Sequence, residues 1–298
     1  MSDQEPRLLS VMICTYRRPS VAATIASVLG QALPDGWTME IVVADNDGEP
    51  TGQAAVEGAA APDGAPVRYV HAPRQNISIA RNACLNAAQG QWAAFIDDDE
   101  IAEPGWLAAL IEASAEADVV FGRSRAVMEP GTPAWMADGA FHHNEIAPGE
   151  PLHNGYTCNV LLNMEKVRAL GLQFDKAFGL TGGEDTSFFY EFGLGGARFA
   201  YRPDAVVSED IPIGRSSFKW LFKRRYRSGQ THWDIQVRNA ESRGKLAALA
   251  AAKVVFCAGS AALSGFQPRA RNKALLRGAL HLGVLSRAFG GQRHLEYA

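Results

Sequence analysis

The first half of the chain alternates short apolar runs with longer amphipathic segments. Five runs rich in Val, Ile and Phe predict buried strands at residues 8–14, 40–44, 67–71, 92–96 and 118–121. Helical patterns between them predict helices over residues 20–33, 53–60, 79–89 and 104–117, the last with Pro104 near its first position. This alternation is typical of a parallel, doubly wound α/β sheet. Ligands of such sheets bind at the carboxyl ends of the strands, so we expect chemistry directly after each strand.

The second half follows a different pattern. Residues 122–180 are rich in Gly, Pro, Trp and His, which predicts loops and short strands that cover a substrate over one face of the sheet. A helix is expected from Glu184. Three further helices are predicted over residues 217–239, 245–264 and 268–289, the first of them strongly basic.

Charge divides the chain into the same two parts. The formal net charge is only −3, from 29 basic and 32 acidic residues. Residues 1–210, however, carry 13 basic and 29 acidic side chains, whereas residues 211–298 carry 16 basic and 3 acidic ones. We therefore predict an acidic body and a basic appendage, which would seek an anionic surface such as phosphates or lipid headgroups.

Cysteine spacing and the start of the chain bear on the compartment. Cys14, Cys84, Cys158 and Cys257 form no CxxC pair, which argues against a zinc ribbon or a disulfide scaffold and fits a reducing compartment. Met1 is followed by polar residues rather than an apolar run, so no signal peptide is expected. The pattern favours the cytoplasm.

Four consecutive carboxylates, Asp97, Asp98, Asp99 and Glu100, follow the apolar run WAAFI. Like charges at a strand end raise one another's pKa, and a divalent cation relieves the repulsion. Carboxylate oxygens are hard ligands that suit Mg²⁺ or Mn²⁺. A metal site is therefore predicted here, and the alternative is an acidic turn in solvent.

Polar residues follow two other predicted strands. Thr15, Tyr16 and Arg17 lie in the CTYRRP segment, where they could hold a base, ribose or phosphate. The alternative is a solvated loop that starts a helix at Pro19. Asp45, in VVADND, could accept hydrogen bonds from a base or ribose, or belong to an ordinary Asx turn.

Two helix starts carry further candidates. In NISIARN, Asn76 or Ser78 can cap the helix, and Arg81 falls in its first turn, where the helix dipole disfavours a cation unless it has an anionic partner. A surface arginine is the alternative. In GGED, Glu184 and Asp185 begin a helix after two glycines; Asp185 could act as a general base, or both acids could simply favour the helix N-terminus.

Together these segments resemble the inverting family-2 glycosyltransferases of the GT-A fold. The order CTYRRP, VVADND, NISIARNACLNAAQGQWAAFIDDDE and GGEDTSFFYEF carries the resemblance, which covers about residues 8–235. Within that family the sequence is similar to the glucosyltransferases of succinoglycan-type exopolysaccharide assembly, with VADND, NISIARN, PAWM, GYTCN, GGEDT and KRRYRSGQTH shared. The implied fold is a mostly parallel Rossmann-like sheet with flanking helices, plus a C-terminal basic helical appendage. The resemblance also implies a nucleotide-sugar-binding and catalytic domain over 1–210 and a membrane-associating region over 211–298.

The resemblance also implies roles for single residues. Thr15, Tyr16 and Arg17 would contact the nucleotide, Asp45 the uracil, and Arg81 the nucleotide. Asp97, Asp98 and Glu184 are expected to contact the nucleotide sugar. Asp97 and Asp99 match the ends of the DXD motif, with Asp99 as a direct metal ligand. Asp185 matches the catalytic base. Many members have a metal-binding His after a late strand, where this chain reads VSED, so Glu209 is the candidate substitute.

The basic segment adds candidates for the acceptor. Six basic side chains and no acid lie between residues 211 and 233, interleaved with aromatic residues, a pattern of interfacial helices on anionic lipid. Candidates to contact the acceptor or a diphosphate are Trp135, Asn159, Arg224, Arg225, Gln230 and Trp233. No nucleic-acid-binding signature is found, so nucleic acid is not an expected partner.

The segment 246–266 carries one charge, Lys253, and is long enough to span a bilayer. Ala and Gly dominate it, and Lys253 lies near its middle. A helix on the membrane surface, paired with the basic segment 269–287, is therefore favoured over a span. A soluble helical hairpin is the remaining alternative.

The sequence therefore predicts a metal-dependent enzyme at the cytoplasmic face of the bacterial inner membrane. It would move a hexose, glucose from UDP-glucose, with inversion onto a polyprenyl-diphosphate-linked oligosaccharide. The alternatives are an inverting transferase of another sugar for capsule, holdfast or lipopolysaccharide assembly, and an inactive glycosyltransferase-like protein that binds a membrane surface.

Overall fold

A computed structural model describes residues 6–59, 64–144, 155–239 and 241–293. These residues form two compact units, here called unit 1 and unit 2. Unit 1 comprises residues 1–126, 143–180 and 184–210, and unit 2 comprises residues 127–142, 181–183 and 211–298. The basic appendage thus shares its unit with two short segments from the middle of the chain.

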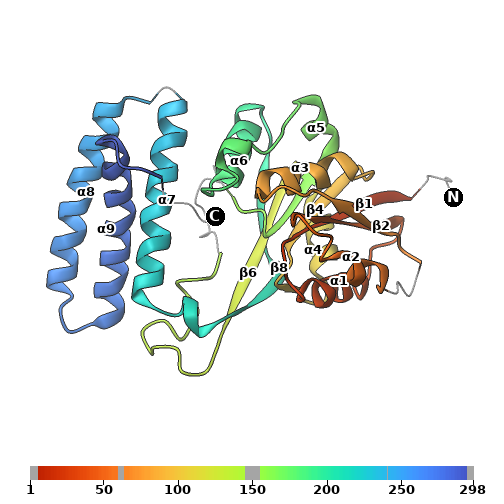
Figure 1. Cartoon of the computed structure of the whole chain (residues 1–298), viewed down its shortest axis with the longest axis horizontal. Helices are drawn as coiled ribbons and strands as arrows, with labels where there is room; N and C mark the ends of the chain where they lie inside the picture. Colours follow the sequence, from red (N-terminus) through yellow and green to blue (C-terminus); the bar gives the residue numbers. More distant parts are fainter. Residues whose placement is uncertain (1–5, 60–63, 145–154, 240, 294–298) are drawn as a thin grey trace. The chain divides into compact units, whose positions relative to one another are not determined.

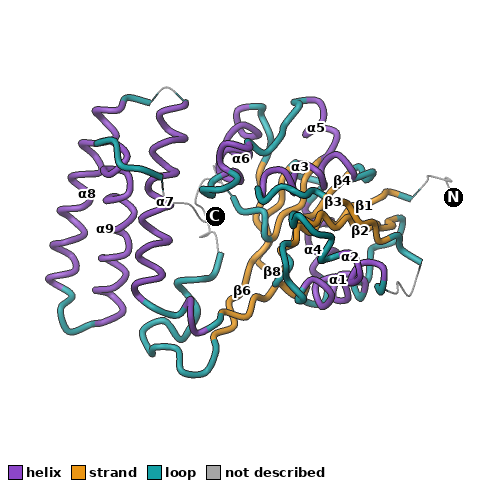
Figure 2. The backbone as a smooth tube through the Cα atoms, in the orientation of Figure 1, coloured by secondary structure: helices purple, strands orange, loops and turns teal. Residues whose placement is uncertain are grey.

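The described residues contain one eight-stranded mixed sheet with flanking helices (Figure 1). Its strands are β1 (Arg7–Thr15), β2 (Trp37–Asp45), β3 (Val67–His71), β4 (Trp92–Asp97), β5 (Glu100–Ala102), β6 (Val119–Met128), β7 (Asn159–Asn163) and β8 (Phe199–Ile211). The helices and the two 3-10 turns, coloured purple in Figure 2, are α1 (Val21–Leu29), α2 (Gln53–Glu57), α3 (Ile77–Ala87), α4 (Trp106–Ala113), α5 (Met164–Ala169), η1 (Lys176–Phe178), α6 (Glu184–Leu194), η2 (Ile213–Arg215), α7 (Phe218–Arg238), α8 (Arg243–Leu263) and α9 (Pro268–Ala288).

The strand order is β3-β2-β1-β4-β7-β6-β8-β5. The first four strands in this order are parallel, whereas β7 runs antiparallel to both β4 and β6, and β5 antiparallel to β8. The register aligns Thr15 with Asp45 and Cys14 with Asp97. The carboxyl ends of β1, β2 and β4 therefore meet at one edge of the sheet, where the sequence predicted the chemistry.

Alternation along the strands fills two apolar layers, one on each face of the sheet. In β1, Leu9, Val11 and Ile13 belong to the layer covered by α1, α2 and α4, while Met12 belongs to the layer covered by α3, α5 and α6 (Figure 1). Because both faces are covered, the central strands consist almost entirely of apolar residues. This explains why the sequence pattern located them.

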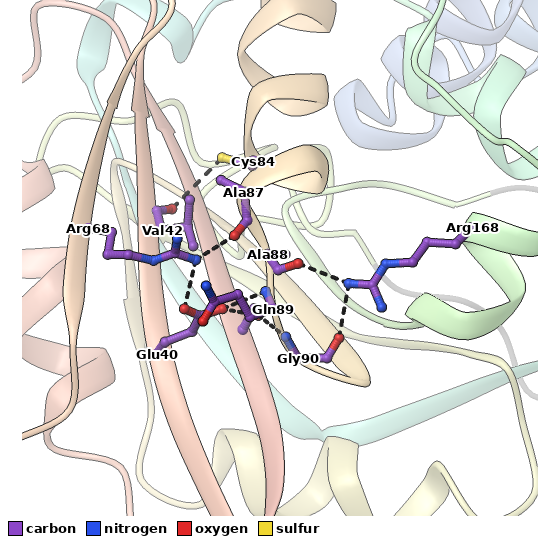
Figure 3. Close-up of polar contacts among 10 residues, drawn as sticks. Glu40, Val42, Arg68, Cys84, Ala87, Ala88, Gln89, Gly90 and Arg168 are labelled. Carbon is purple, nitrogen blue, oxygen red and sulfur yellow. Dashed lines mark hydrogen bonds and ion pairs between the residues drawn. The ribbon is translucent and has the colours of Figure 1, made fainter.

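A polar cluster fixes the opposite, amino-terminal end of the parallel strands (Figure 3). The buried Glu40 carboxylate on β2 accepts hydrogen bonds from Ser10 Oγ (2.6 Å), the Gln89 backbone N–H (2.7 Å) and the Arg68 guanidinium (2.8 Å). The Gly90 backbone N–H donates to Ser10 Oγ at 2.8 Å. These bonds hold the turn between α3 and β4 and so set where β4 begins.

Several predicted boundaries move. The helix predicted over 104–117 is Trp106–Ala113, because Gly105 precedes it in a left-handed conformation (φ 84°) and leaves Pro104 outside. The helix predicted over 20–33 ends at Leu29, and the one predicted from 79 begins at Ile77. Asn76 caps this last helix, as predicted, with its side chain accepting from the Ile79 backbone N–H.

The region 122–180 was predicted as loops and short strands over one face, and its described part is more regular. Strand β6 runs to Met128, and β7 is a buried strand inside the sheet, followed directly by α5. The short run NVLLN gave too brief a pattern to distinguish a central strand from a loop segment. Residues 145–154 of the predicted covering segment lie outside the described residues.

Unit 2 contains a layer of three helices, with α9 packed between α7 and α8 (Figure 1). Gly229 of α7 and Gly283 of α9 lie where the two helices cross, and a Cβ on either would overlap the backbone carbonyl of the other helix. Apolar contacts of Trp233, Ala250 and Val284 join the three helices. The helices predicted for this region are thus present.

Candidate active site at the strand ends of unit 1

The carboxylates after β4 lie at the junction of β4 and β5. Asp97 ends β4, and Glu100 begins β5. Burial is the largest cause that raises the pKa of Asp97, to about 6, and repulsion from Asp99 adds to it while Arg81 opposes it. Burial likewise raises the pKa of Asp98 to about 7, against the opposing effects of Arg18 and Thr15. Desolvation, more than the predicted mutual repulsion, therefore disfavours the charged form of these groups.

Three side chains at the end of β1 and in the loop after it each meet a carboxylate. Thr15 Oγ1 donates to Asp98 Oδ2 at 2.7 Å, and Arg18 forms ion pairs with Asp98 and Asp99. Arg17 is a non-glycine residue with positive φ (54°) and binds Asp47 through two bonds of 2.8 and 2.9 Å. Its guanidinium also lies 5.1 Å from the centre of the Tyr16 ring. The predicted nucleotide-contacting loop is thus tied to the carboxylates that follow β2 and β4.

Asp45 is fully buried at the end of β2 (0% exposed). Its carboxylate accepts from the Gly52 backbone N–H (2.7 Å), Tyr69 Oη (2.9 Å) and the Asp47 backbone N–H (3.1 Å). Burial and the bond to Asp45 raise the pKa of Tyr69, so the phenol stays a donor. Asp45 therefore shapes the turn between β2 and α2, and the predicted contact to uracil stays a prediction.

Arg81 and Glu184 form a buried ion pair between α3 and α6. Burial alone would lower the pKa of Arg81, but the nearby Glu184, Asp185 and Asp97 outweigh it and raise that pKa, so the guanidinium stays charged. It also lies 5.5 Å from the centre of the Phe174 ring. Because α3 begins at Ile77, Arg81 falls in the second turn rather than the first, and Glu184 is the anionic partner that the dipole argument required.

One carboxylate oxygen of Glu184 accepts no hydrogen bond from the described residues. Its Oε1 meets Arg81, while Oε2 is buried without a hydrogen-bond partner among the described residues. Burial raises the pKa of Glu184, and Arg81 opposes this effect. Asp185, the next residue, is only half-buried and accepts a bond from the Thr186 backbone N–H at 2.7 Å. One acid is therefore held in place and the other is open to solvent.

The two glycines before α6 are required by the backbone. Gly182 and Gly183 have φ of 77° and 100°, a region that side chains rarely adopt. A Cβ on Gly183 would also overlap Thr231 of α7, within unit 2. The glycines thus set the path of the chain that delivers Glu184 and Asp185 to the start of α6.

Glu209 was predicted to follow a late strand, but it lies inside β8, in register with Glu100 of β5. The continuous ladder between β5 and β8 explains the difference. Burial is the main cause that raises the pKa of Glu100 well above its usual range, and negative charge on Glu209 adds to this effect. Its proposed service as a metal ligand stays a prediction.

Asn159 belongs to the interior of unit 1. Its amide donates to the carbonyls of Arg123 (3.0 Å) and Ala205 (2.9 Å), and its Oδ1 accepts from Trp106 Nε1 at 2.8 Å. Contact with an acceptor would break these bonds. The amide thus joins β6, β7 and β8, and its contact with an acceptor stays a prediction.

The remaining acceptor candidates lie in unit 2. Trp135 packs edge-on against Phe141, and Trp233 is buried among α7, α8 and α9. Gln230 is buried, and its side chain donates to the Gln292 carbonyl at 2.9 Å. Arg224 lies over the Trp220 ring at 5.4 Å, and Arg225 beside it is exposed. Contact of these residues with an acceptor stays a prediction.

The carboxylate oxygens at the end of β4 and after it are chemically suited to bind a divalent cation, because positive charge stabilises desolvated carboxylates. Asp97, Asp98 and Asp99 supply hard oxygen ligands, and Arg18 provides positive charge to two of them. Within the ranges that the structure describes, no group of three or more His, Cys, Asp or Glu side chains is arranged to hold a metal ion.

Some residues of this site were not predicted from the sequence. Arg18 and Asp47 bind the predicted residues Asp99 and Arg17, and Tyr69 binds Asp45. Arg18 stands in the CTYRRP segment and Asp47 in VVADND, so their motifs could have suggested them. Tyr69 lies in β3 and carried no signal of its own.

Solved structures show that this architecture is the GT-A fold. The mannosyltransferase PcManGT from Pyrobaculum calidifontis, solved in complex with GDP-Man and Mn²⁺, superposes with a TM-score of 0.65 at 19% identity, over 97% of this chain and 89% of that one. The S. aureus protein TarS matches with a TM-score of 0.52 at 17% identity, over 93% of this chain and 55% of TarS. At these identities the likeness defines the fold, and it confirms the predicted fold class.

The family follows from sequence comparison. Residues 10–171 match the model of glycosyl transferase family 2. The succinoglycan biosynthesis protein ExoM of Rhizobium meliloti (strain 1021) is 41% identical over 295 residues, covering 97% of this chain and 95% of ExoM. The chain belongs to glycosyl transferase family 2, and the predicted resemblance is confirmed.

Proposed function

We propose that this glycosyltransferase moves a hexose, glucose from UDP-glucose, with inversion onto a polyprenyl-diphosphate-linked oligosaccharide in bacterial exopolysaccharide assembly. The observation that carries the proposal is the buried ion pair of Arg81 with Glu184, which ties α3 to the start of α6, where Asp185 lies. The name of ExoM, a succinoglycan biosynthesis protein, supports the polysaccharide product.

Asp185 is the proposed general base. Its position at the start of α6 leaves the carboxylate half-buried, beside the positive partial charge of the helix N-terminus. Removal of a proton from the acceptor hydroxyl by such a group contributes typically ~10²–10⁴-fold to the rate. Attack in line with the departing UDP would invert the anomeric carbon, so an α-linked donor yields a β-linked product.

The carboxylates after β4 would bind the donor diphosphate through Mg²⁺ or Mn²⁺. Asp97 and Asp99 are the proposed ligands, and when bound the ion supplies positive charge against the leaving diphosphate. Thr15 fixes the orientation of Asp98 between them through its 2.7 Å bond. Arg18 already balances part of the negative charge.

The acceptor would be presented at the cytoplasmic face of the inner membrane. Support comes from the charge of residues 211–298, with 16 basic and 3 acidic side chains, because anionic phospholipids attract such segments. The candidates on α7, Arg224 and Arg225, would meet the lipid diphosphate. Peripheral attachment is proposed in place of a spanning helix.

The donor is tested with a panel of UDP- and dTDP-sugars, measuring nucleotide release with and without Mn²⁺ or Mg²⁺. Release from UDP-glucose well above the other donors, abolished by chelation and restored by either ion, is the expected result. A preference for another sugar would replace the donor assignment, and ion-independent release would remove the metal from the proposal.

The base is tested by Asp185→Asn. We expect transfer to fall by about 10²–10⁴-fold while the Kd for UDP changes less than about threefold, because the amide cannot accept the hydroxyl proton. Glu116→Gln removes an exposed carboxylate elsewhere in unit 1 and serves as the matched control with unchanged turnover. Retained transfer by Asp185→Asn would refute this role.

A further inference from the structure

Helix α8 exposes large apolar side chains along its whole length, with the exposed Lys253 between them. The large side chains Leu249, Phe256 and Leu263 are 48%, 67% and 92% exposed, and Val255 and Phe266 are 73% and 104% exposed. Leu249, Phe256 and Leu263 are seven residues apart and therefore share one side of the helix. Within the described chain, α8 is the helix long and apolar enough to cross a membrane, with only 17% of its most apolar stretch buried.

A neighbouring stripe of α8, about 100° further round the helix, packs within unit 2. Ala250, Cys257 and Ala261 are buried, and a Cβ on Gly278 of α9 would lie 3.3 Å from Cys257 Cβ, a tight contact. Small residues thus bring α8 close to α9, while the large apolar ones point elsewhere. Packing within unit 2 therefore accounts for one side of α8 only.

The neighbouring helix determines how α8 would meet a bilayer. Helix α9 runs back along α8 over 21 residues, about 30 Å, and exposes Arg271, Lys273 and Arg277. If α8 crossed the membrane, α9 would enter with it, and Arg277 near its middle would lie in the hydrocarbon. A layer lying on the surface instead lets these long cations reach the headgroups.

The charge of this region favours lipid, rather than a second copy of this chain, as the partner of the exposed side of α8. Residues 211–298 carry 16 basic and 3 acidic side chains, and Arg243–Leu263 itself contains no acidic residue. Two copies joined through α8 would bring two strongly basic regions together. An anionic bilayer supplies both the apolar layer and the opposite charge.

We propose that α8 lies in the plane of an anionic membrane and inserts Leu249, Phe256 and Leu263 among the lipids, with the exposed Phe266 at the turn into α9. The basic residues of α9 then meet the headgroups at the edge of this surface. This inference rests on the proposed function, because it specifies which residues would contact the membrane. It concerns unit 2 alone.

The test is co-flotation of the full chain with vesicles of phosphatidylcholine alone or with 30% phosphatidylglycerol. Wild type should bind the anionic vesicles at least tenfold more than the neutral ones, and 0.5 M salt should release it. The double variant Phe256→Gln/Leu263→Gln should lose binding tenfold or more, since two insertions are removed at exposed positions. Leu194→Gln, which alters a 71% exposed leucine of α6 in unit 1, is the control with unchanged binding.

Three outcomes would overturn the inference. Equal binding to neutral vesicles that resists alkaline carbonate extraction indicates a span. Wild-type dimers that the double variant converts to monomers, without vesicle binding, indicate a second copy. Unchanged binding of the double variant places the contact elsewhere. Nucleotide release measured on the same samples, with unfolding midpoints, separates failure of this surface from failure of the proposed catalytic function.

Discussion

At the scale of single residues, the pair Arg81–Glu184 joins two parts of the candidate site that are 103 positions apart in the sequence. Arg81 is buried by α3 and Phe174, and Glu184 is the first residue of α6. This pair therefore positions the start of α6, and with it Asp185, relative to Asp97. Arg81 binds Glu184 through Nη1, and its contact with the nucleotide, implied by family resemblance, stays a prediction.

Glu184→Gln separates these two roles of Arg81. Neutralising Glu184 leaves Arg81 without its buried anion, so the start of α6 shifts and kcat falls by about 10–100-fold, as 1 Å displacements at a reacting centre do. Steady-state kinetics should show KM for the donor changing less than threefold. A large rise in KM and in the Kd for UDP at constant kcat would instead assign the arginine to nucleotide contact.

At the scale of elements, close contact between helices rests on glycine. Gly283 of α9 approaches the Tyr226 carbonyl of α7, and Gly229 of α7 approaches the Leu280 carbonyl of α9. The polar cluster at the amino end of the sheet also contains a glycine at a close backbone contact. A Cβ on Gly90 would lie 2.6–2.8 Å from three backbone atoms. Both places require a residue without a side chain, whatever its helix or strand propensity.

Gly283→Ala should destabilise the three-helix layer of unit 2. The added methyl forces α7 and α9 apart, which costs about 3 kcal/mol in the free energy of unfolding. Gly259→Ala is the matched control, because nothing lies within 4 Å of its Cβ position on α8. There the substitution should stabilise by about 0.5–1 kcal/mol through helix propensity. Urea titrations compare the two, and equal effects would contradict the tight crossing.

At the scale of the whole molecule, the near-neutral charge of −3 is an average over two unlike regions. The acidic body places carboxylates where strands end, and several are buried there. The basic region concentrates cations around aromatic rings, as where Arg215 and Arg224 both lie over Trp220. Charge patterning thus separates regions whose chemistry differs.

Acid should weaken the protein through His142 of unit 2. Burial lowers the pKa of this imidazole to about 4, and Arg224, Arg215 and Arg225 also disfavour its charge. The unfolded state binds a proton near pH 6.5, so stability is complete above that pH and declines as pH falls toward 4, by at most about 1.4 kcal/mol per unit. His142→Phe keeps the stack on Trp220 and should remove this part of the slope. Identical slopes for the two proteins in urea titrations would contradict the assignment.

The sequence alone determined the alternation of strands and helices, the family, and the residue types at strand ends, because those depend on local pattern and chain order. Only the tertiary structure decided that β7 enters the sheet and that Arg81 pairs with Glu184. It also decided that the oxygens of Asp45 are bonded within the protein. Such pairings join residues tens to a hundred positions apart, and no local periodicity encodes them. Likewise, composition showed that α8 is apolar, while its packing on α9 determined which side remains exposed.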